Sequence, residues 1–217
     1  MKKNVMMRVA SALLVAVLMT TCAISGTFAK YTTSDSATDS ARVAKWGVTV
    51  DVTGETAFAK KYDNEASATG VKVVSDTEVV APGTNGTLGG ITIGGETEVM
   101  VDVVVTADLE LTGWEIGGVE YCPIVFTVGS TDIKIDGSTI TDVDDLEAAV
   151  EKVFTDLSKN DVAANTDLGA TVSVSWRWDF YTSDANDVKD TELAKLADEG
   201  HAPEISFTCT VEVTQVD

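Results

Sequence analysis

Residues 170–180 read ATVSVSWRWDF, a stretch in which apolar and polar side chains alternate. Alternation with a period of two places successive side chains on opposite faces of a β-strand. Ser173, Ser175 and Arg177 then share one face, and the larger apolar side chains share the other. The stretch therefore predicts a strand with one solvated face and one buried face, whose inward residues are Val172, Val174, Trp176 and Trp178.

The same alternation recurs in three other long stretches, WGVTVDV at 46–52, TEVMVDVVVT at 97–106 and EISFTCTVEVTQVD at 204–217. Half-solvated strands are typical of antiparallel sheets, and two such sheets bury their apolar faces on each other. The predicted fold class is therefore all-β, an antiparallel two-sheet sandwich. Shorter candidate strands lie at 71–74, 86–93, 123–128 and 131–135, and polar turn clusters lie at 81–86 and 116–120. On the three long stretches the predicted inward residues are Trp46, Val48, Val50, Val52, Val99, Val101, Val103, Val105, Ile205, Phe207, Cys209, Val211 and Val213.

Two helical patterns interrupt the strands. The first covers residues 142–159. Its expected first turn is acidic, which suits the positive end of the helix dipole. The second and shorter one covers 191–200, with Asp190 as the expected cap and Gly200 as the expected stop. We expect both in connections at the edge of the sandwich. The first helix should have one apolar face, made of Leu146, Ala149, Val150, Val153 and Leu157.

The amino terminus has the pattern of a secretory signal peptide. Basic residues precede an apolar run from Ala12 to Met19, which is too short to span a bilayer comfortably. Thr27 and Ala29 then place small residues at the positions required for cleavage before Lys30. An uncleaved membrane anchor and a lipoprotein modified at Cys22 are the alternatives.

We therefore predict three regions and a secreted, extracellular location. Residues 1–29 form the signal peptide, 30–42 a flexible polar segment, and 43–217 the β-sandwich domain. Contact with the membrane is expected only during export. The formal net charge is −20, and the signal peptide holds none of the acidic residues. Nucleic acid is excluded as a partner, because phosphate binding needs clustered lysine and arginine.

Site chemistry is sparse. His201 is the single histidine and no HExxH motif is present, so the sequence does not favour a zinc peptidase or any other enzyme. Cys122 and Cys209 share the parity of apolar neighbours, which leaves a buried disulfide and two buried free thiols equally open. We expect no cofactor. Calcium is the better metal candidate, through the carboxylates at 142–145 and those of Asp184, Asp187 and Asp190.

Several of these stretches resemble a known family. The leader followed by GTFAKYTTSDSATDSARVAKWGVTVDV (26–52) resembles the processing region of proteins handled by SipW-type signal peptidases. Residues 81–105 resemble the body of the TasA/camelysin family. Residues 121–128, 175–200 and the closing TCTVEVTQVD resemble uncharacterised members of that broad group. The resemblance implies a jelly-roll-like sandwich, export with a SipW-type signal peptidase as transient partner, and assembly into biofilm matrix fibres. It also implies that a mature amino-terminal segment, here Lys30 and Tyr31 to Arg42, is donated as a strand to the next subunit.

Three functional classes follow. The first is a secreted structural subunit of the extracellular matrix of a Gram-positive biofilm, which partners itself or other matrix proteins. The second is a carbohydrate- or surface-binding adhesion module, suggested by Trp46, Trp114, Trp176 and Trp178. The third is a camelysin-like metallopeptidase, because some relatives in the family are classed as such.

Overall fold

The computed structural model describes residues 6–7, 9–15, 42–53, 57–63 and 72–216. The chain divides into two compact units, Met1–Val43 and Ala44–Asp217. In the first unit residues 6–7 and 9–15 are helical and exposed. No helix among the described residues is both long and apolar enough to cross a membrane. The predicted cleavage residues Thr27, Ala29 and Lys30, and Tyr31 of the predicted donor segment, lie outside the described residues.

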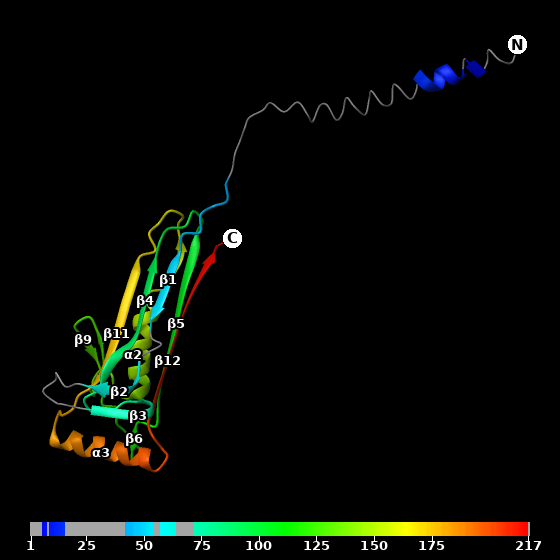
Figure 1. Cartoon of the computed structure of the whole chain (residues 1–217). Helices are drawn as coiled ribbons and strands as arrows, with labels where there is room; N and C mark the ends of the chain where they lie inside the picture. Colours follow the sequence, from blue (N-terminus) through cyan, green and yellow to red (C-terminus); the bar gives the residue numbers. More distant parts are fainter. Residues whose placement is uncertain (1–5, 8, 16–41, 54–56, 64–71, 217) are drawn as a thin grey trace. The chain divides into compact units, whose positions relative to one another are not determined.

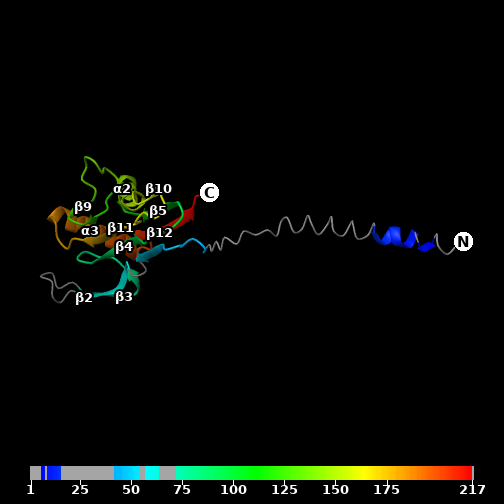
Figure 2. The ribbon, with the colours of Figure 1, turned by 90° about the horizontal axis from the view of Figure 1, so that it is seen from above.

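The second unit is an antiparallel β-sandwich with two main sheets (Figures 1 and 2), as the alternating stretches predict. A five-stranded sheet has the order β1 (Thr49–Thr53), β4 (Asn85–Gly94), β11 (Ala170–Trp178), β8 (Ile124–Val128), β9 (Thr131–Ile133). A three-stranded sheet has the order β10 (Lys159–Val162), β5 (Val101–Thr112), β12 (Glu204–Gln215). Two hairpins complete the strands, β2 (Ala59–Asp63) with β3 (Lys72–Val79), and β6 (Glu115–Ile116) with β7 (Val119–Glu120).

The core lies between the two sheets, and the predicted parity is confirmed on the central strands. In β11 the side chains of Val174, Trp176 and Trp178 are buried, whereas Ser173 and Ser175 are exposed. In β5 the odd-numbered valines and leucines are likewise buried, and Ala107 is half-buried. The indole of Trp176 donates from Nε1 to the carbonyl oxygen of Ala57 at 2.8 Å, so its single polar group is satisfied inside the core.

The inward direction predicted for Val50 and Val52 of the first strand is confirmed, but the burial that it implies is not found. Val50 and Val52 oppose Ile93 and Ile91 across the β1–β4 pair, so they lie on the inner face of the sheet. Both are nevertheless 42% exposed, whereas the two isoleucines are 1% exposed. Trp46, which precedes β1, is 50% exposed. The reason is that β1 is an edge strand, so its inner face extends past the cover that the opposite sheet provides.

Two helices flank the sandwich. Helix α2 (Val143–Thr155) begins at Asp142, whose side chain accepts a hydrogen bond from the Asp145 backbone N–H. Helix α3 (Asp184–Asp198) begins at Ser183, whose hydroxyl accepts from the backbone N–H of Asn186. The prediction that Asp190 caps the second helix is therefore wrong, because this residue lies inside α3 and is buried. Gly200 follows the end of α3 with a φ of +83°, as expected of a helix stop.

Candidate functional site: the open side of the sandwich

The two long sides of the sandwich, where the edges of the sheets meet solvent, differ in how they are covered. We call them the α2 side, next to β9 and β5, and the β1–β12 side. On the α2 side the helix packs against β5 and β9. Its side chains Leu146, Val150 and Phe154 are fully buried in the core that both sheets share. The ring of Phe154 lies 5.0 Å from that of Phe207 on β12, so the helix reaches well into the interior.

Side chains from α2 and the turn after it also satisfy the backbone edge of β5. Strand β10 pairs only with the first residues of β5, between Val101 and Val103. Further along β5, the backbone N–H of Leu109 donates to Glu151 at 3.0 Å and that of Leu111 donates to Glu147 at 2.6 Å. The N–H of Val105 donates to the Ser158 hydroxyl at 2.9 Å. This edge is therefore closed to another strand, because a neighbour would have to displace these acceptors.

The β1–β12 side has no such cover among the described residues. Strand β1 ends the five-stranded sheet and β12 ends the three-stranded sheet, and the two lie beside each other without pairing. β12 pairs with β5 along all of Glu204–Gln215, so its other edge is a continuous row of backbone groups. Two adjacent unpaired edges are the feature that an added strand recognises, because it can satisfy the N–H and C=O groups that the fold leaves over.

The inward side chains of β12 show the same incomplete cover. They follow the predicted parity, but each is only half-buried although it packs against the core. Together with Val50 and Val52 they form an apolar strip along the β1–β12 side. The residues of the strip on β12 are Ile205, Phe207, Cys209, Val211 and Val213.

Cys122 and Cys209 are free thiols in the structure. Cys122 precedes β8 and is buried, and its burial raises the pKa of the thiol to about 12. Cys209 lies on β12 in the apolar strip and is half-buried, and desolvation also raises its pKa. A thiol reacts through its thiolate, so Cys122 is the less reactive of the two.

The structure does not bring together the residues that were weighed as metal ligands, the histidine for zinc and the aspartates for calcium. His201 is exposed in the loop after α3. Among the described residues, no three histidine, cysteine, aspartate or glutamate side chains converge in a way that could hold a metal ion. The carboxylates considered for calcium have local partners: Asp142 caps α2, Asp145 accepts from Thr141, and Asp184 accepts from the Tyr181 hydroxyl at 2.7 Å.

No protein-family model matches the chain, and no curated protein and no solved structure matches it either.

Proposed function

We propose that the protein is a secreted structural subunit whose β1–β12 side accepts a strand from a neighbouring copy. The observation that carries the proposal is the contrast between the two sides of the sandwich. The chain covers the β5 edge with its own helix, and the described residues leave the β1 and β12 edges unpaired. Natural sandwiches usually blunt or cover their edges, so a long uncovered edge beside an apolar strip indicates a binding surface.

The incoming strand would gain two kinds of interaction. Its backbone would hydrogen-bond along β12, at a net gain of about 1 kcal/mol for each bond. Its alternate side chains would cover Val50 and Val52, which are now 42% exposed. The contact between the donated strand of one copy and the β1–β12 side of the next can repeat along a row of subunits. It can repeat because the donor segment and the accepting side are different parts of the chain. Such heterologous contacts build fibres or rings.

The donor we propose is the segment 30–42. Fully extended, its 13 residues would reach over about 43 Å at roughly 3.3 Å per residue, and the 12 residues of β12 span about 40 Å at the same rise. The donor is therefore long enough to follow the whole of β12. The resemblance of this region to TasA/camelysin proteins also supports it. Between Tyr31 and Arg42 its side chains are all small, serine, threonine, aspartate and alanine, so most of the attachment would come from the backbone.

Charge sets the conditions for assembly. The chain has a formal net charge of −20, and like subunits therefore repel each other. Salt, calcium or mild acidification should each favour assembly by weakening that repulsion. In this proposal the protein has no catalytic step, and its partners are its own copies or other matrix proteins.

The test compares protein that starts at Lys30 with protein that starts at Val43. Electron microscopy and sedimentation velocity, at several salt concentrations and pH values, report assembly. We expect fibres or long oligomers only from the protein that keeps residues 30–42. Equal assembly by both forms would overturn strand donation by this segment, and no assembly by either form would favour the adhesion-module alternative.

A further inference from the structure

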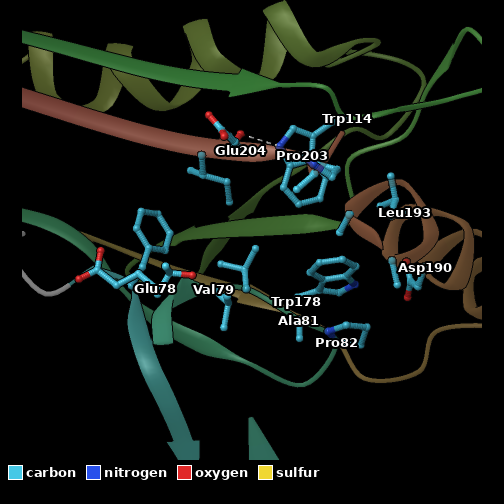
Figure 3. A pocket seen from close by; sticks show the side chains of 17 residues that line it. Glu78, Val79, Ala81, Pro82, Trp114, Trp178, Asp190, Leu193, Pro203 and Glu204 are labelled. Carbon is cyan, nitrogen blue, oxygen red and sulfur yellow. Dashed lines mark hydrogen bonds between the residues drawn. The ribbon is translucent and has the colours of Figure 1, made fainter. Parts of the chain in front are cut away.

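A second feature of the fold lies at the end of the sandwich where β12 begins. It is a pocket of about 680 Å³. The end of β3 and the turn after it form one wall, α3 forms another, and the first residues of β12 form a third. Figure 3 shows Trp178 and Asp190 at one end of the pocket and Glu78 toward the other. This volume is in the range of pockets that hold small organic molecules or single large side chains.

The walls are mainly apolar and aromatic. The rings of Trp114 and Trp178 meet edge to face, with centroids 5.6 Å apart. Trp114 is held in place because its Nε1 donates to the Glu204 carbonyl oxygen at 3.0 Å. Phe58 adds a third aromatic ring to the lining. Aromatic side chains attract cations through the negative potential of their ring faces, and tryptophan does so most strongly.

The charged residues of the lining all have the same sign. Asp190, Glu78 and Glu204 line the pocket, and the described residues of its lining include no lysine, arginine or histidine. Glu78 and Glu204 are exposed at the rim, whereas Asp190 is 8% exposed. The pocket is therefore acidic and apolar at once, in a chain whose net charge already attracts cations.

None of the described residues that line the pocket offers a cation to the carboxyl group of Asp190. The Tyr121 hydroxyl donates to its Oδ1 at 2.7 Å. Burial raises the pKa of Asp190, and the hydrogen bond from Tyr121 and the nearby indole N–H of Trp178 partly oppose this effect. The N–H of Trp178 is close enough to act on the carboxylate but does not reach hydrogen-bonding geometry, so Nε1 of Trp178 is buried without a partner among the described residues. A positive group in the pocket would stabilise the ionised carboxylate and draw this N–H onto it.

We propose that this pocket binds an organic cation, an ammonium or guanidinium group on an apolar stem, between the tryptophan rings and the Asp190 carboxylate. The stem would pack against the apolar walls, which include Pro82 and Pro203. The same chemistry is presented by a free amine and by an arginine or lysine side chain. The site is independent of strand donation, because it needs only the single folded sandwich.

The test uses the protein that starts at Lys30, with tryptophan fluorescence and calorimetry as readouts. The probes are choline, agmatine, and the uncharged isostere of choline in which a tert-butyl group replaces the trimethylammonium group. We expect at least one cation to bind at least about tenfold more tightly than the isostere. An amino-terminally acetylated peptide of residues 36–44, whose single cationic side chain is Arg42, distinguishes a side-chain source from a free amine when it is compared with the same peptide carrying Arg42→Gln.

Two variants locate the binding. Asp190→Asn keeps an acceptor for Tyr121 and removes the charge, so we expect about a tenfold loss of cation affinity. Asp198→Asn, at the exposed end of α3, removes the same charge outside the pocket and should leave the affinity unchanged. Circular dichroism of both variants confirms the fold. Equal binding of choline and its isostere, unchanged affinity in Asp190→Asn, absence of binding by every cation and by the peptide, or binding only of a neutral sugar such as N-acetylglucosamine would each overturn the proposal.

Discussion

The α2 side and the β1–β12 side differ in how their sheet edges and the adjoining core are covered. Each is a place where two sheet edges and the end of a hydrophobic core meet solvent. On the α2 side the chain inserts Leu146 and Val150, both 0% exposed, and offers glutamate oxygens to the N–H groups of β5. On the β1–β12 side Val50 and Val52 remain 42% exposed, and no described strand pairs with either edge. The α2 side is completed within the chain, and we propose that the β1–β12 side is completed by a partner.

The largest difference between the sides should be seen in stability. Leu146→Ala leaves a cavity in the closed core, and we expect it to lower the free energy of unfolding by about 2–5 kcal/mol. Val52→Ala removes apolar surface that is already 42% exposed, so we expect a loss of about 1 kcal/mol or less. Urea unfolding of the protein that starts at Val43, at a concentration where it is monomeric, measures both. Equal losses would show that the two sides are equally well packed.

A smaller effect tests the hydrogen bonds that close the β5 edge. Replacing Glu147 and Glu151 together by alanine leaves the N–H groups of Leu109 and Leu111 without their acceptors. We expect a loss of about 1–3 kcal/mol for the pair, together with new self-association through the uncovered edge. Glutamine at both positions retains an acceptor oxygen and should restore most of the stability. Sedimentation velocity of the alanine variant detects the self-association, and a variant that stays monomeric and fully stable would contradict this role.

Much of the sandwich could be predicted from residue patterns alone. The alternation in β11 and β5 predicted both the strands and their buried faces, and Asp142 marked the start of α2. The strand β10 was missed because Lys159–Val162 is mostly polar and is a strand only through its pairing with β5. The start of α3 was missed because serine, aspartate and asparagine, which occur from Ser183 onward, are common both in turns and at the start of a helix.

The contrast between the two sides could not be predicted in this way. A period of two indicates which residues share a face, and it does not indicate whether another sheet covers that face. Val50 and Val174 have the same pattern, yet one is in an edge strand and the other in a central strand. The order of strands in each sheet decides their burial, and that order results from tertiary pairing. Likewise, Glu147 and Glu151 resemble ordinary surface positions of a helix until β5 is placed beside them.

The pocket at the end of the β1–β12 side gives a pH-dependent prediction. Burial raises the pKa of Asp190 in the folded protein, so the folded state holds this proton more tightly than the unfolded chain does. The resulting stabilisation is fully present below the pKa of an unfolded aspartate, about 4, and is lost as the pH rises through the folded value. Asp190→Asn cannot ionise, so we expect it to be more stable than the natural protein at pH 7. The advantage should shrink as the pH falls toward 4. Urea unfolding of both proteins at several pH values checks this, and a constant difference would contradict it.

The most direct test of the central claim uses the cysteine that the chain already has on its open side. Cys209 lies in the apolar strip of β12, and Cys122, whose burial raises its pKa to about 12, serves as an unreactive internal reference. A thiol reagent at pH 8, followed by mass spectrometry, gives the labelling rate of each cysteine in monomers and in assemblies. We predict that Cys209 of the protein starting at Lys30 labels faster than Cys122 in the monomer and becomes protected when subunits assemble. Assemblies in which Cys209 labels as fast as in the monomer would show that neighbouring subunits do not occupy the β1–β12 side.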